Sequence, residues 1–228
     1  MHPPSRAFLF GTDVQGRDVF ARVLFGARLS LSVGLVSQAI ACALGLALGL
    51  VAGYAGRWVD AGVMRLADVT LAFPSLLLLI AIAAAVRPSL PLVFVVIGVV
   101  GWAGMARLVR GQVLVVRALE YVQAARALGA SDARIIARHL LPNVLAPVVV
   151  AATLGIGGAI MAEAALSFVG LGAQPPTPSW GAMVADGRDP LRVAPWGSLF
   201  PGVAIGLTVL GVNLLGDGLR DALDVRAR

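Results

Sequence analysis

Five long stretches without a charged residue divide this sequence. They cover residues 29–56, 69–86, 88–106, 140–162 and 193–216. A bilayer core about 30 Å thick needs roughly 20 apolar residues per helix, and each stretch has that length or nearly so. The chain is 59% hydrophobic and 13% charged, whereas soluble domains average about 25% charged residues. The sequence therefore predicts an all-α, polytopic bundle of five transmembrane helices.

The arginines predict how the bundle is oriented. The sequence contains no lysine, so all 18 basic residues are arginine. When residues 117–143 and the C-terminal tail (218–228) are placed in the cytoplasm, most arginines lie inside, as the positive-inside rule requires. Four arginines then fall in an external N-terminal lead-in, residues 1–28, namely Arg6, Arg17, Arg22 and Arg28. Because such a segment is a poor insertion substrate, we expect a further transmembrane helix upstream of it.

The residues that common enzyme chemistries need are missing. A Walker A phosphate loop needs lysine, so any ATP that drives this protein is expected to bind to another subunit. The sequence has two histidines, His2 and His139, and neither an HExxH nor a GxSxG motif. The single Cys42 lies inside an apolar stretch and offers no thiol pair for a metal. We expect no enzyme activity, no cofactor and no nucleic-acid partner.

Residues 117–143 form the longest polar interval between two apolar stretches. They predict a helix, a helix-ending glycine at Gly129 and a second helix over residues 133–141. Ser131 is placed to cap the second helix, and Asp132 lies in its first turn. Six arginines lie on or beside this segment: Arg107, Arg110, Arg117, Arg126, Arg134 and Arg138. The arginines indicate a surface for a cytoplasmic partner.

Several residues within the apolar stretches stand out. Gly45, Gly49 and Gly53 recur every fourth residue, which suits close helix packing; packing within the chain and a subunit interface are equally compatible with the pattern. Glu163 lies near the outer end of its stretch, where we expect its carboxyl group to reach water. Asn213 is expected to be buried and to bond to a neighbouring helix.

Proline and aromatic residues predict the remaining features. Pro74 and Pro147 are expected to kink their helices, and the Pro88–Pro91 segment is expected to make a tight turn. Residues 57–68 mix apolar and charged side chains, as a short interfacial helix does. Residues 172–197 contain several prolines and two tryptophans, which predicts a structured external loop.

The polar interval resembles the EAA loop of ABC-importer permease subunits. The resemblance rests on Gln123-Ala124-Ala125-Arg126-Ala127-Leu128-Gly129 followed by Leu141-Pro142-Asn143. The lead-in motif at 11–18 and the segments 162–168, 174–181 and 213–224 are similar to the dipeptide, oligopeptide and nickel permeases of the DppC/OppC type. The similarity covers essentially the whole chain, although the first transmembrane helix of that family is absent and Gln123 replaces the family's glutamate.

The resemblance implies a type I ABC-importer permease fold at 29–217 in a bacterial inner membrane. Its implied partners are a sister permease, two ABC ATPase subunits, an external solute-binding protein and the bilayer. The residues implied to couple to the ATPases are Glu120, Gln123, Ala124, Ala125, Arg126, Gly129, Leu141 and Pro142. The implied cargo is a di- or oligopeptide, or a related solute such as nickel.

Two other functions remain open from the residues. A self-sufficient secondary transporter would need inverted repeats and titratable groups near the midplane; no convincing repeat is visible, and Glu163 is off-centre. A structural membrane scaffold would not need the helix–glycine–helix segment at 117–143.

Overall fold

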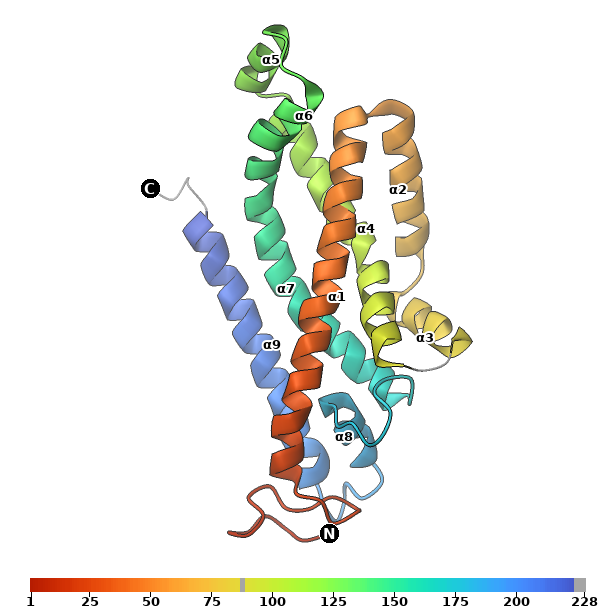
Figure 1. The fold of residues 1–228 in the computed structure, drawn as a ribbon. Helices are drawn as coiled ribbons and strands as arrows, with labels where there is room; N and C mark the ends of the chain where they lie inside the picture. The colour runs from red at the N-terminus through yellow and green to blue at the C-terminus, as the bar shows by residue number, and fades with distance from the viewer. Residues whose placement is uncertain (87–88, 224–228) are drawn as a thin grey trace.

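A computed structural model describes residues 1–86 and 89–223. The described part is an elongated bundle of helices with their axes roughly along one direction (Figure 1). The helices, in chain order, are α1 Val19–Ala55, α2 Arg57–Ala72, α3 Ser75–Ala85, α4 Leu90–Arg117, α5 Glu120–Ala127, α6 Asp132–Ile135, a π-helical turn at Ile136–Leu140, α7 Leu141–Phe168, α8 Trp180–Asp186 and α9 Trp196–Leu223. One end of the bundle carries α5 and α6, and the other carries α8 and the N-terminus (Figure 1). We call these the α5 end and the α8 end.

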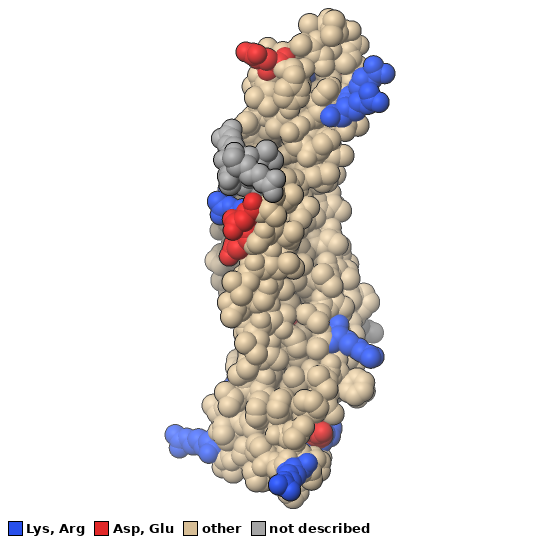
Figure 2. Space-filling model, turned by 90° about the vertical axis from the view of Figure 1, so that its left-hand side faces the viewer, with Lys and Arg blue, Asp and Glu red and all other residues tan. Residues whose placement is uncertain are grey.

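Within the described residues, four helices are long and apolar enough to cross a membrane. They are α1, α4, α9 and the continuous helix Asp132–Phe168, which contains α6 and α7. The bent pair of α2 and α3 brings the number to five if it is counted as one span. Figure 2 shows charged side chains at both ends of the visible face and others partway along it, separated by broad uncharged surface. These features agree with the predicted polytopic helical bundle.

α1 begins earlier than the predicted span. The expected start was residue 29, but the helix starts at Val19, because the Asp18 side chain accepts a hydrogen bond from the Phe20 backbone N–H at 2.9 Å. Arg22 and Arg28 therefore lie on α1 and not in the lead-in. The lead-in packs on the α8 end, where the Phe10 ring stacks on Phe200 at 3.8 Å.

α2 covers the short helix predicted at 57–68, and its interfacial position stays a prediction. It runs beside α1 and α4 (Figure 1), and Ala67 is buried. Asp60 accepts two hydrogen bonds from Arg110 of α4, at 2.6 and 2.7 Å. The Asp60 carboxylate is therefore directed at α4.

The predicted single span at 69–86 is broken in two. α2 ends at Ala72, α3 begins at Ser75, and their axes differ by 89°. The break falls at Pro74, where a kink was expected, because proline cannot continue the hydrogen-bond pattern of a helix. Pro147 lies inside α7, which continues past it. Of the predicted turn at 88–91, Pro88 and the preceding Arg87 lie outside the described residues, and Ser89 precedes α4.

The three spaced glycines of α1 face α4. A Cβ added at Gly49 would lie 2.6 Å from the carbonyl oxygen of Ala106, and one added at Gly53 would lie 2.8 Å from Val113 Cβ. Gly45 is equally close to Met105. The small residues thus let two helices of the same chain approach closely. α9 extends to Leu223, so the first part of the expected tail is helical; Asp224, Arg226 and Arg228 lie outside the described residues.

Candidate functional site

The helix–glycine–helix segment predicted at 117–143 is present at the α5 end. α5 spans Glu120–Ala127 and ends in two reverse hydrogen bonds: Gly129 N–H donates to Arg126 O and Ala130 N–H donates to Ala125 O, both at 3.0 Å. This pair is a Schellman ending, which needs a left-handed residue after the helix. Gly129 supplies it with φ +82°. Ser131 occupies the N-cap position of α6, although its side chain makes no capping bond.

Buried apolar residues hold α5 and α6 on the bundle. Val122 of α5 is 1% exposed, and Ile135 of α6 is fully buried. They share one core cluster with Val113 and Val116 of α4 and with Val144 of α7. The segment is therefore packed against α4 and α7.

Polar contacts join the segment to α1. The Tyr54 hydroxyl donates a hydrogen bond to Asp132 at the start of α6, and the Arg126 guanidinium lies 5.5 Å from the Tyr54 ring centre. Arg117 Nη1 donates to the Gly53 carbonyl oxygen at 2.7 Å. The end of α1 is thus bound to α4, α5 and α6.

His139 and Asn143 join α5 to the start of α7. Asn143 Nδ2 donates to the Tyr121 hydroxyl at 3.3 Å and to the His139 carbonyl oxygen at 2.7 Å. The Tyr121 and His139 rings lie 5.9 Å apart. These contacts hold α5 against the start of α7.

The outward face of α5 is small and partly apolar. Gln123, Ala124 and Ala127 are exposed, Ala125 is half-buried, and Leu128 is 89% exposed. Gln123 Nε2 donates to the Ala118 carbonyl oxygen at 3.0 Å. A depression of about 630 Å³ lies beside this face and is lined by Arg117, Ala118, Gln123, Arg126 and Ala127. Glu120 and Pro142 are exposed, and Leu141 is half-buried.

Four of the six arginines make contacts within the chain, and the arginine-rich docking surface stays a prediction. Arg107 pairs with Asp68 at 2.6 Å, and Arg110 pairs with Asp60. Arg117 and Arg126 contact α1 as described above. Arg134 and Arg138 are exposed. Asp60 and Asp68, two turns apart on one face of α2, were the sequence signal for these pairs.

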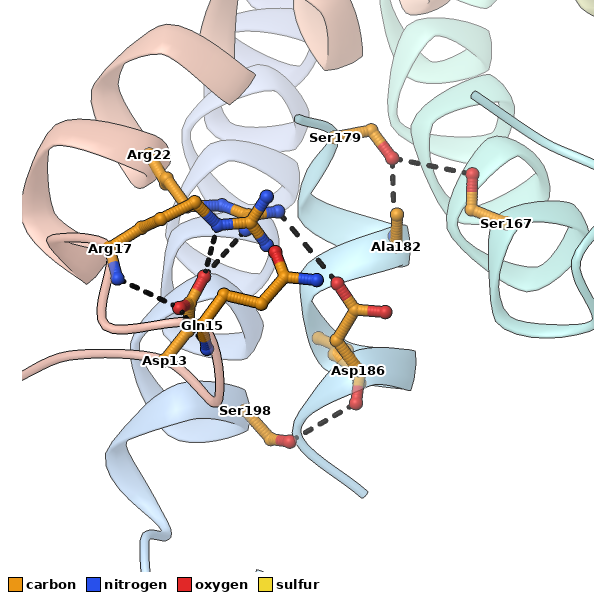
Figure 3. Close-up of polar contacts among 10 residues, drawn as sticks. Asp13, Gln15, Arg17, Arg22, Ser167, Ser179, Ala182, Asp186 and Ser198 are labelled. Carbon is orange, nitrogen blue, oxygen red and sulfur yellow. Dashed lines mark hydrogen bonds and ion pairs between the residues drawn. The ribbon is translucent and has the colours of Figure 1, made fainter. Parts of the chain in front are cut away.

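An ion-pair cluster lies at the α8 end and was not predicted (Figure 3). Asp13 accepts hydrogen bonds from Arg17 Nε at 2.7 Å and from Arg22 Nη1 at 2.6 Å. Arg22 Nη2 also lies 3.8 Å from Asp186 Oδ2 of α8. Partial burial raises the pKa of the Asp186 carboxyl group, an effect that Arg17 opposes. The cluster connects the lead-in to α1 and α8 beside a cavity of about 260 Å³.

Glu163 is fully enclosed near this end of α7, so the prediction that it reaches water is wrong. It is 1% exposed. Its carboxyl group accepts a hydrogen bond from Ser167 Oγ at 2.6 Å and a long one from Ser30 Oγ of α1 at 3.5 Å. Ser167 in turn contacts Ser179, the N-cap residue of α8, at 3.3 Å (Figure 3). The hydroxyl groups of the protein therefore take the place of water around Glu163.

We expect Glu163→Gln to keep the protein close to wild-type stability, because an amide can still bond to Ser30 and Ser167. Glu163→Ala would leave buried hydroxyl groups without their acceptor and should lower the free energy of unfolding by about 1–3 kcal/mol. Thermal unfolding of the purified protein in detergent measures both. Equal stability of the two variants would contradict a structural role for these hydrogen bonds.

Asn213 of α9 is half-buried, not buried as predicted. It faces α7, where a Cβ added at Gly157 would lie 3.5 Å from Asn213 Oδ1. The Asn213 side-chain oxygen therefore lies beside Gly157 of the neighbouring helix.

Comparison with known proteins gives one family. A model of the family described as "Binding-protein-dependent transport system inner membrane component" matches residues 45–228. The dipeptide transport system permease protein DppC of Alkalihalophilus pseudofirmus is 52% identical over 225 residues, which are 99% of this chain and 74% of the relative. The glutathione transport system permease protein GsiD of Pectobacterium atrosepticum is 46% identical, with coverage of 99% and 75%.

Two solved structures share the fold. The inward-facing MetNI methionine ABC transporter superposes with a TM-score of 0.72 at 20% identity, covering 89% of this chain and 96% of that chain. A crystal structure of an amino acid ABC transporter with histidines gives a TM-score of 0.69 at 14% identity, with coverage of 90% and 95%. At this level of identity the superpositions concern the fold alone.

Proposed function

Since the chain belongs to the family of binding-protein-dependent transport system inner membrane components, we propose that it imports short peptides and that α5 and α6 receive the motion of separate ATPase subunits. Family membership makes the chain a multi-pass membrane permease of an ATP-driven importer. The peptide cargo is supported by relatives named for the transport of dipeptides and of glutathione, itself a short peptide. The comparisons give no support to a self-sufficient secondary transporter.

The observation that carries the coupling proposal is the construction of the α5 end. α5 presents small side chains and the exposed Leu128 outward, while Val122 fixes the opposite side of the helix in the core. A short helix of this kind can lie in a groove of another protein without large side chains holding the two backbones apart. Force applied to α5 then passes to α4 and α7, because their side chains share one core cluster.

We propose that the α5 end faces the cytoplasm and the α8 end faces the exterior. The arginine distribution supports this orientation. A sister permease would complete the membrane part, two ATPases would contact α5 and α6, and a solute-binding protein would deliver cargo at the α8 end. Glu120 and Gln123 lie on α5 as proposed polar contacts to the ATPase, with Gln123 in place of the family's glutamate.

Reconstitution tests the proposed function. The chain, its sister permease and two ATPases in liposomes are expected to hydrolyse ATP faster when peptide-loaded binding protein is added outside, and to accumulate peptide. An Ala124→Cys variant in a Cys42→Ala background should form a crosslink to the ATPase, since Ala124 is exposed on α5. Peptide uptake by this chain alone, driven by an ion gradient, would refute the proposal. Labelling of the Ala124→Cys thiol from outside intact cells would refute the orientation.

A further inference from the structure

A groove of about 280 Å³ lies between α1, α3, α4 and α7, roughly halfway along α1. Four glycines line it, two from α4 and two from α7: Gly101, Gly104, Gly155 and Gly158. None of the described residues that line it is charged. Small residues on membrane helices also allow close helix packing, so the glycines alone do not indicate a binding site. The evidence for one comes from the polar groups in the groove.

Ser37 lies at the floor of the groove with an unused hydroxyl group. The residue is 1% exposed, and its Oγ has no hydrogen-bond partner among the described residues. Nearly all buried polar atoms in proteins are paired, and a helical serine or threonine commonly bonds back to its own helix. Thr153 and Thr70 do so in this chain, at 2.9 and 3.0 Å. Ser37 does not, and because its Oγ is itself enclosed, a molecule in the groove would reach this unpaired hydroxyl only by displacing a neighbouring side chain.

Gln38 adds a carboxamide next to Ser37. Within the described residues its one hydrogen bond runs from Nε2 to Cys42 Sγ, a weak acceptor, at 3.5 Å. A Cβ added at Gly155 would lie 2.5 Å from Gln38 Cδ and 2.7 Å from Nε2. Gly155 therefore leaves the space that the carboxamide occupies. An amide with most of its hydrogen-bonding capacity unused is costly in the middle of a membrane protein.

The first residue of α3 also lines the groove. Ser75 follows Pro74, which provides no side-chain cap for the helix. The N–H groups of a first helical turn have no acceptors within the helix. The 89° break between α2 and α3 thus brings the N-terminus of α3 to the groove. Interrupted helices in transporters place such ends at the solute.

We propose that this groove is the part of the translocation path that binds the main-chain amide groups of the peptide. The inference rests on the proposed peptide import. Ser37, the Gln38 NH2 group and the N-terminus of α3 donate hydrogen bonds to peptide carbonyl oxygens, and Gln38 Oε1 accepts from peptide N–H groups. The glycines admit a backbone, and the uncharged lining does not discriminate between peptide side chains.

Ser37→Ala is the sharpest test. In the reconstituted importer, the loss of one hydrogen bond to the peptide should lower uptake about fivefold to tenfold. The unfolding temperature should stay the same or rise, because the hydroxyl has no partner in the described chain. Binding-protein-stimulated ATP hydrolysis should persist. Thr70→Val is the control, since its hydroxyl bonds to its own helix, and its uptake should be unchanged. Wild-type uptake by Ser37→Ala would overturn the proposal.

Access to the groove is a second readout. A Cβ added at Gly158 would meet nothing within 4 Å among the described residues. Gly158→Cys in a Cys42→Ala background should therefore react with a charged, membrane-impermeant thiol reagent in the assembled complex, and peptide should slow the reaction. Leu207→Cys, exposed on α9, is the comparison position and should not react.

The two failures can be told apart. A wild-type complex that hydrolyses ATP but imports no peptide would refute the proposed cargo, and with it the peptide in the groove. If the wild-type complex imports peptide but the thiol of the Gly158→Cys complex stays unreactive, the proposed peptide site in the groove is overturned and the proposed cargo is not.

Discussion

Gly129→Pro is expected to abolish peptide uptake while the protein remains in the membrane. Gly129 has φ +82° and donates its N–H to Arg126 O, whereas proline holds φ near −65° and has no N–H. We expect proline to raise the free energy of the helix–glycine–helix segment by about 3 kcal/mol, as it does inside a helix. The fraction of molecules in which this segment has its native shape would then fall roughly a hundredfold. α5 would then lose its fixed orientation to α6. Uptake and binding-protein-stimulated ATP hydrolysis in liposomes measure the effect.

Gly129→Asn is the matched control. Asparagine tolerates a positive φ better than other residues with a side chain and keeps the N–H, and an added Cβ at this position would meet nothing within 4 Å among the described residues. Uptake by this variant should stay within a few-fold of wild type. Normal uptake by Gly129→Pro would show that the ATPases do not act through the shape of this segment.

Gly49→Ala is expected to destabilise the protein by about 1–3 kcal/mol, the range for overpacking. The upper part of this range applies, because the new methyl group would lie 2.6 Å from the Ala106 carbonyl oxygen, a backbone atom that cannot rotate away. α1 and α4 would have to separate. The unfolding temperature in detergent and the amount of protein in the membrane should both fall.

Gly206→Ala adds the same methyl group to α9, where it would meet nothing within 4 Å in the described part of the chain. Its unfolding temperature should not fall. A Gly49→Ala protein as stable as Gly206→Ala would mean that α1 and α4 are not packed as closely as the structure has them.

The sequence predicted the helix–glycine–helix segment because its signals are local. Gly129 ends α5 and supplies the left-handed backbone, and Asp132 begins α6, all within a few residues. The apolar stretches likewise predicted the long helices, since hydrophobic length is a property of a single segment. The start of α1 at Val19 was not predicted, because Arg22 and Arg28 lie in its first turns and the uncharged stretch begins only after them.

The features that the sequence did not reveal depend on pairs of distant residues. The pairing of Asp60 with Arg110, fifty positions later, was not predicted, because nothing local to either residue indicates it. Glu163 was expected to reach water, because nothing in the sequence places Ser30 and Ser179 near it. The sequence of one segment does not show whether a polar side chain is exposed or is paired with a residue of a distant segment. That difference depends on how the segments pack against one another.

The helix Asp132–Phe168 has 37 residues and is unbroken from α6 to the serines around Glu163. At 1.5 Å per residue it is about 55 Å long. A tilt of about 5° at one end would displace the other end by roughly 5 Å, given that length. In the proposed orientation, the helix that the ATPases would contact at α6 therefore reaches the surface that faces the outside of the cell. A protein resting on that surface could sense, without contacting nucleotide, whether ATP had been bound on the far side of the membrane.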